Sequence, residues 1–216
     1  MATFVQAVNN VLQRLREESV TNVEDTDYST MLGILVNDAK REIEDAHEWS
    51  QLQDVITVAT TASDYTYTLT GSGSRFRMQM ATNDTQDILL RAIPVNVMRR
   101  RHLIGTTQNG SPSDYCLTGV DASGDYLFEV NPTPDGVYSL VFDVVVPQAD
   151  LVDSADTISI PFHLVCQLAY SKAIAERGED SGVTASEAYM MYRLSLADAI
   201  SIDRNHFSED VTWLAT

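Results

Sequence analysis

The chain has 216 residues, 44% of them hydrophobic, so it can bury a sizeable core in one domain or in a domain with a subdomain. Its formal net charge of −17 argues against sequence-independent binding of nucleic acid. No run approaches the roughly 18 apolar residues of a membrane helix, and residues 1–6 lack the basic and apolar parts of a signal peptide. We therefore expect no membrane contact, and assembly in the cytoplasm where the chain is made.

Two amphipathic helices are expected at the start of the chain. Residues 3–18 carry apolar side chains at helical spacing, and Asp25 or Thr26 can cap a second helix over 27–49. The second helix has one apolar face and one charged face, and the charged face is expected to be solvated. Trp49, at its end, is predicted to be a core anchor between the helices and the insertion.

From about residue 52 the hydrophobic period changes from that of a helix to the two-residue period of a strand. A short helix over 95–104 interrupts this region. After Pro147 the strand pattern fades into a loop that is rich in Asp. The expected strands lie at 55–58, 65–69, 75–80, 114–118, 125–130 and 137–146, with a short apolar run over 88–93.

Two more helices are expected near the end of the chain. Pro161 suits the start of the third helix, and Gly178 suits its end. The fourth helix begins near 184 and fades near 204. The last residues, 205–216, have no sustained period but contain Phe207, Trp213 and Leu214, so this tail is expected to dock, either on its own domain or on a partner.

These elements predict an α+β fold. Its helical part would be a four-helix bundle formed by the N- and C-terminal helices, with a central antiparallel β-rich insertion. The expected division is a helical domain of residues 1–51 and 161–204, a β-rich insertion of residues 52–160 and a tail of residues 205–216.

No catalytic motif is present. The sequence contains no phosphate-binding loop, no nucleophile elbow and no His-Glu-x-x-His pair. Two cysteines are too few for a disulfide scaffold or a zinc site, and the histidines lie in four different elements. We therefore expect no enzyme activity, no cofactor and no metal. The histidines are His47, His102, His163 and His206, and the cysteines are Cys116 and Cys166.

The segment 121–125 partly resembles the start of a calcium-binding loop. Such a loop needs a Glu at its twelfth position, where this chain has Pro132. We therefore interpret 121–125 as the turn of a hairpin.

One cluster of basic residues stands out in this acidic chain, formed by Arg99, Arg100 and Arg101. Guanidinium groups bind carboxylates through two parallel hydrogen bonds, so the cluster could contact an acidic neighbour, including another copy of the chain. The alternative is local pairing with Asp84, Asp87 or Asp114.

The order of elements resembles the head-to-tail adaptor proteins of tailed bacteriophages, the group that includes the tail tubular protein A of short-tailed phages. The resemblance covers most of the chain and is carried by three parts. They are residues 40–49, which end in Trp49, the helix from Pro161, and the insertion with Pro112-Ser113-Asp114-Tyr115 and Asn131-Pro132-Thr133-Pro134-Asp135-Gly136-Val137-Tyr138.

The resemblance implies a structural subunit of the virion neck. It implies a ring, usually a dodecamer, that binds the portal protein and presents a platform for the tail nozzle while DNA passes through without specific binding. On this reading Phe207, Trp213 and Leu214 would bind the portal, and Arg99, Arg100 and Arg101 would contact a neighbouring subunit. The alternatives are a head-completion or tail-terminator subunit and, less favoured by the residues, a hydrolase that uses carboxylates.

Overall fold

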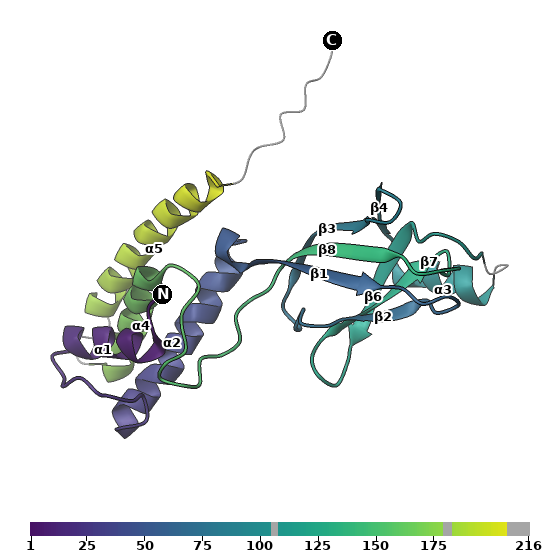
Figure 1. The fold of residues 1–216 in the computed structure, drawn as a ribbon. Coiled ribbons are helices and arrows are strands. Elements are labelled where there is room, and N and C mark those ends of the chain that lie inside the picture. Colours follow the sequence, from purple (N-terminus) through teal and green to yellow (C-terminus); the bar gives the residue numbers. More distant parts are fainter. Residues whose placement is uncertain (105–107, 179–182, 207–216) are drawn as a thin grey trace, which may run out of the picture. The chain divides into compact units, whose positions relative to one another are not determined.

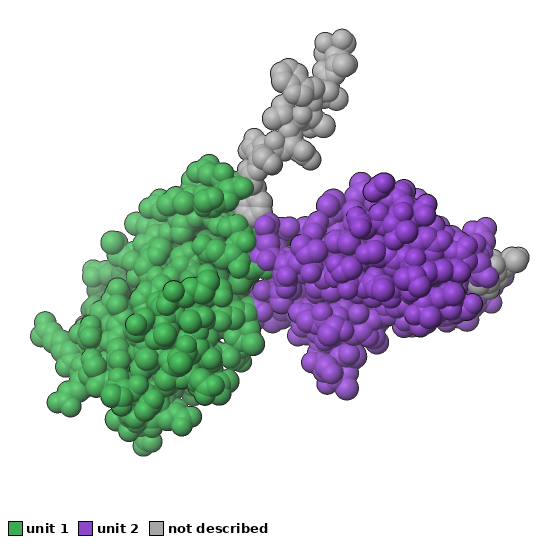
Figure 2. All heavy atoms as spheres, in the orientation of Figure 1, with its two compact units in different colours: residues 1–52, 148–216 green, residues 53–147 purple. Residues whose placement is uncertain are grey.

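The computed structural model describes residues 1–104, 108–178 and 183–206. The chain divides into two compact units, one made of residues 1–52 with 148–216 and the other of residues 53–147 (Figures 1 and 2). We call them the helical unit and the β-rich unit. In the described part of the chain, no helix is both long enough and apolar enough to cross a membrane.

In the helical unit α4 is the central helix, because it packs against α1, α2 and α5, and α1 also packs against α2. Side-chain caps begin the first two helices: Thr3 and Thr26 each accept a hydrogen bond from a backbone N–H of the first turn. As predicted, Pro161 precedes α4 and Gly178 ends it with φ 65°. The helices are α1 (Phe4–Arg14), α2 (Asp27–Ala46), α4 (Phe162–Arg177) and α5 (Val183–Arg204), with a 3₁₀ turn at Ser50–Leu52.

The segment 148–160 completes the helical unit without forming a helix or strand of its own. The Asn37 side chain exchanges two hydrogen bonds with the backbone of Leu151, and the backbone N–H of Phe4 donates to Asp156 O. The buried Lys40 ammonium donates to Gln148 O at 2.7 Å. These bonds join α1 and α2 to the returning chain.

Trp49 is buried with 1% of its surface exposed, and its indole N–H donates to Ile43 O at 2.8 Å. The prediction that Trp49 is a core residue is confirmed. The wider helical core is formed by small and branched residues at helical spacing from α1, α2 and α4. They include Val8, Val11, Leu12, Leu32, Val36, Ala39, Ile43, Leu164, Val165, Leu168 and Ala169.

The β-rich unit contains two four-stranded sheets, with strand orders β1-β8-β3-β4 and β2-β7-β6-β5. Residues from both sheets share one core, in which the rings of Phe128 and Phe142 meet edge to face at 4.9 Å. The hairpin predicted at 121–125 is confirmed, since it joins β6 to β7. The strands are β1 (Gln53–Ala59), β2 (Thr66–Leu69), β3 (Arg77–Asn83), β4 (Ile88–Leu89), β5 (Arg91–Ala92), β6 (Asp114–Val120), β7 (Tyr126–Asn131) and β8 (Ser139–Val145).

The predicted α+β class is confirmed, but the four-helix bundle with one central antiparallel insertion is wrong. The described residues form five α-helices and two sheets, and the fifth helix, α3 (Val95–Leu103), lies inside the β-rich unit. The insertion is also not purely antiparallel, because β5 pairs with β6 in parallel. Parallel neighbours need a crossover connection, and α3 lies in the one between β5 and β6.

Candidate functional site

The C-terminal helix α5 has apolar side chains on two opposite faces. One face carries Ala185, Tyr192 and Ala199, which repeat every seven residues and are buried, and α4 is the helix against which α5 packs. Burial raises the pKa of the Tyr192 hydroxyl to about 12. The other face carries five large apolar side chains that are between 62% and 66% exposed. We call them the outer stripe: Val183, Met190, Met191, Leu194 and Ile202.

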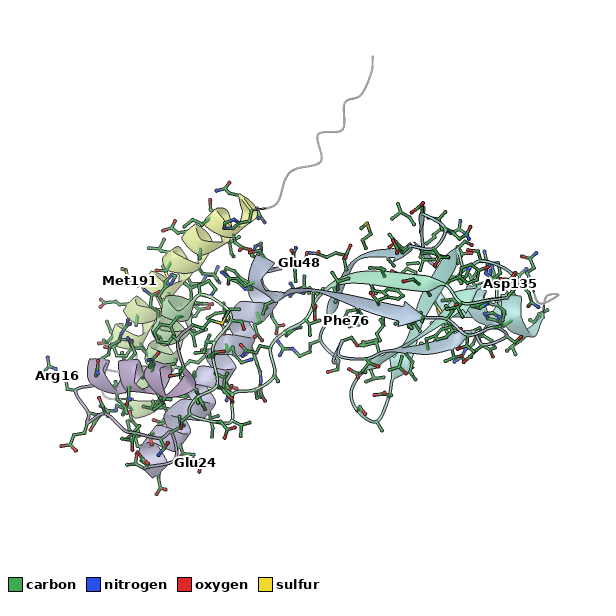
Figure 3. The ribbon with its side chains drawn as sticks, viewed as in Figure 1. Arg16, Glu24, Glu48, Phe76, Asp135 and Met191 are labelled. Atoms are coloured by element: carbon green, nitrogen blue, oxygen red, sulfur yellow. The ribbon has the colours of Figure 1, made fainter. Side chains whose placement is uncertain are left out.

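Helical geometry aligns three members of the outer stripe, and the other two lie about a quarter of a turn around the helix. Val183, Met190 and Leu194 follow one another at spacings of seven and four residues, which places them on the face opposite Tyr192. Met191, labelled in Figure 3, and Ile202 lie on the adjoining line of the same helix. Single exposed apolar residues are ordinary on protein surfaces, whereas a helix that is apolar on both faces is usually buried on both. The outer stripe is therefore the best candidate for a surface that a partner covers.

A second candidate surface lies on α3 of the β-rich unit. Leu103 and Ile104, at the end of this helix, are 76% and 81% exposed. Arg99 and Arg100 are exposed on the same helix, whereas the Met98 side chain of this helix is fully buried. The predicted arginine cluster thus lies beside exposed apolar side chains.

Asp114 joins α3 to the sheet. Its buried carboxylate accepts hydrogen bonds from Arg91 Nε at 2.8 Å and from an Arg101 guanidinium nitrogen at 2.5 Å. Burial opposes the charged form, but the two arginines outweigh it and hold the pKa of Asp114 below its ordinary value. Local pairing, one of the two alternatives for the cluster, therefore holds for Arg101, whose side chain remains 36% exposed.

The other predicted site residues, Phe207, Trp213 and Leu214, lie outside the described residues.

Both cysteines are buried, and burial raises the pKa of Cys166 to about 12, so this thiol is not a reactive thiolate at neutral pH. His102 stacks on Tyr65 with ring centroids 4.2 Å apart. Across the described ranges, no group of three or more His, Cys, Asp or Glu residues could hold a metal ion.

Asp203 forms a cluster that the sequence did not predict. Its carboxylate accepts hydrogen bonds from Ser50 Oγ at 2.6 Å and from the Ser50 backbone N–H at 3.0 Å, and it lies 3.1 Å from His47 Nε2. Ser50 and His47 both contact the Asp203 carboxylate. In a catalytic triad the histidine contacts the serine instead, so this arrangement is not a triad. The cluster therefore fastens the end of α5 to the turn that follows α2. Its residues are 153 and 156 positions apart, so no sequence motif could reveal it.

Replacing Asp203 by Asn is expected to lower the free energy of unfolding by about 1–3 kcal/mol at pH 7, because a buried charged acceptor of several hydrogen bonds is lost. Burial opposes the charge of Asp203, but its bonds to Ser50 and His47 lower the pKa in the folded state. Its stabilising effect is therefore present above the unfolded-state pKa of about 4 and is lost as the pH falls through the lower folded value. Urea unfolding at pH 7 and at pH 3 checks this. A difference between D203N and the parent that does not shrink between pH 7 and pH 3 would contradict the electrostatic explanation.

The comparison with protein families identifies the chain. The model of the SU10 adaptor protein family matches residues 2–212, a span that includes every described helix and strand. A search of curated proteins returned no match. The family match confirms the resemblance to phage head-to-tail adaptors, and phage adaptors are structural proteins. The chain therefore belongs to the SU10 adaptor protein family.

Proposed function

We propose that this protein is a subunit of the head-to-tail adaptor ring, joins the portal to the tail and lines the passage for DNA. The observation that carries the proposal is the outer stripe of α5, an exposed apolar surface in a member of an adaptor family. Every copy carries the same stripe, and a contact between unlike surfaces of identical copies closes into a ring when the rotation permits. The net charge of −17 would keep passing DNA from adhering.

In this proposal the three parts of the chain have different roles. Residues 1–51 and 161–204 pack against neighbouring copies in a ring that we take to be a dodecamer, and α5 supplies the most apolar contact. Residues 52–160 face the tail nozzle. Residues 205–216 extend to the portal, with Phe207, Trp213 and Leu214 as the apolar anchors that would fold on binding a groove.

Arg99, Arg100 and Arg101 are proposed to contact a neighbouring subunit. The exposure of Arg99 and Arg100 supports this role, as does the strongly acidic composition that every neighbouring copy shares. Arg101 would contribute through the exposed part of its side chain, because it also holds Asp114.

Deleting residues 205–216 is expected to weaken portal binding by about tenfold or more, since a few buried aromatic and aliphatic anchors supply most of the binding energy of such interfaces. Co-sedimentation with excess portal protein measures the effect. The triple variant F207A/W213A/L214A is the matched control for chain length and should weaken binding to a similar extent. If the truncated chain binds portal protein as well as the full chain does, residues 205–216 are not the portal-binding segment. Recovery of tail-tube protein without portal would favour the head-completion or tail-terminator alternative.

A further inference from the structure

A shallow depression of about 170 Å³ lies in the helical unit, where the ends of α1 and α4 meet the start of α5. Three arginines from two helix ends surround it, and an aromatic ring and an aliphatic side chain complete the lining. We call this the arginine depression. It is lined by Arg14, Leu15, Arg16, Tyr170, Ile174, Arg177 and Thr184.

The charge of the arginine depression is opposite to that of the chain as a whole, which has 31 acidic and 14 basic residues. One of these arginines already pairs with a carboxylate: Glu17 Oε1 lies 2.5 Å from an Arg177 guanidinium nitrogen. Arg14 and Arg16 have no ion pair with any of the described residues. One guanidinium group of the depression thus already binds a carboxylate, and Arg14 and Arg16 supply two more.

Aromatic rings hold two of the three guanidinium groups in place. Arg14 lies over the ring of Tyr170 at 5.6 Å from its centroid, and Arg177 lies over Tyr28 at 5.1 Å. Arg177 Nε also donates to the Tyr28 hydroxyl at 2.8 Å. Guanidinium groups positioned in this way bind carboxylates without losing much side-chain freedom.

Helix electrostatics alone would place some of these arginines here, because cations stabilise the C-terminal ends of helices. That explanation covers Arg14 and Arg177, which lie in the last turns of α1 and α4. It does not cover Arg16, which has φ 61° at the position after the helix where glycine is favoured. Its N–H donates to Gln13 O, and the N–H of Glu17 donates to Leu12 O, as in a glycine-terminated helix. Figure 3 shows the Arg16 side chain projecting from the end of α1.

We propose that the arginine depression binds an acidic segment of a partner protein, whose carboxylates engage Arg14 and Arg16 and compete with Glu17 for Arg177. The aliphatic stem of a Glu or Asp side chain fits against Tyr170 and Ile174, which a bare phosphate would leave uncovered. This site shares no residue with the outer stripe, although Thr184 follows Val183 directly, and it does not depend on the proposed ring.

The test uses the full chain and a fluorescein-labelled hexapeptide of alternating Glu and Asp, with binding followed by fluorescence anisotropy at low salt. The double variant R14Q/R16Q is expected to weaken binding by about tenfold, because two charge-assisted contacts are lost. R193Q/R204Q makes the same change of charge at two exposed arginines of α5 and should change binding by less than about threefold. Equal weakening by the two pairs would overturn the site, as would the absence of saturable binding to the parent chain.

Two further variants separate a binding role from a structural one. E17Q should tighten peptide binding by about threefold, since it frees Arg177, whereas E18Q changes the charge equally and should not. R16G should raise the midpoint of thermal unfolding, because glycine suits the left-handed backbone, yet weaken peptide binding. If R16G instead lowers both the midpoint of thermal unfolding and peptide binding, the role of Arg16 is structural only. Competition by inorganic phosphate at equal charge concentration would show that the depression binds an adventitious anion only. Competition by an oligo-dT strand at equal charge concentration would show a nucleic acid site.

Discussion

Replacing Lys40 by Met is expected to lower the free energy of unfolding by about 3–5 kcal/mol, the largest stability effect that we predict for one side chain. Lys40 and Glu44 are both fully buried, with Nζ 3.2 Å from Glu44 Oε1. Methionine fills a similar volume but removes the ammonium group that pairs with the buried Glu44 carboxylate. Unfolding in urea, followed by circular dichroism at 222 nm, measures the loss.

The large effect follows from what the pair holds. Lys40 donates to Gln148 O at 2.7 Å, and the Gln148 backbone N–H donates to Glu44 Oε1 at 3.2 Å, so the pair fixes the start of segment 148–160 to α2. K172M is the matched control, since Lys172 pairs with Glu42 at a partly exposed position and should cost at most about 1 kcal/mol. The double variant K40M/E44L should be more stable than K40M alone, because no charge is then left buried. Equal losses for K40M and K172M would contradict this account.

The double variant M190E/L194E is expected to reduce ring formation on the portal by about tenfold or more while leaving the fold intact. Both side chains belong to the outer stripe and are 66% and 65% exposed, so the free chain tolerates a charge there. In a ring, the two introduced carboxylates would be desolvated against an apolar surface of the neighbouring copy, which is unfavourable. Analytical ultracentrifugation of the adaptor–portal mixture measures the yield.

The control for this prediction is V137E/V152E, which makes the same change at two exposed valines outside α5. It should assemble like the parent chain. Unchanged assembly of M190E/L194E would show that α5 does not form the contact between copies. An unfolded M190E/L194E would show instead that the stripe already packs within the chain.

Local signals in the sequence predicted the helices well. The second helix was expected over 27–49, and α2 spans Asp27–Ala46, with Thr26 as its cap. The first helix was expected over 3–18 but ends at Arg14, because Arg16 adopts a left-handed backbone that apolar spacing cannot reveal. Caps and periodicity are properties of neighbouring residues, so they can be read from one sequence.

Non-local pairing could not be predicted in the same way. The strand β5 has two residues, too few for any period, and its parallel partner β6 follows only after α3. The outer stripe of α5 could not be recognised from spacing alone, because apolar side chains on two opposite faces of a helix do not define a single buried face. The Asp203 cluster depends on residues far apart in the chain, whereas the pair of Arg101 and Asp114 was among the alternatives considered.

The central claim, a ring of identical subunits beneath the portal, is tested most directly by the mass of the complex that the full-length chain forms with purified portal protein. Our account predicts that the portal gains a multiple of 23.9 kDa equal to one complete ring, with a dodecamer as the expected number, and that negative-stain images show that ring at one end of the portal. A portal that gains a single copy, or none at saturating adaptor concentration, would contradict it.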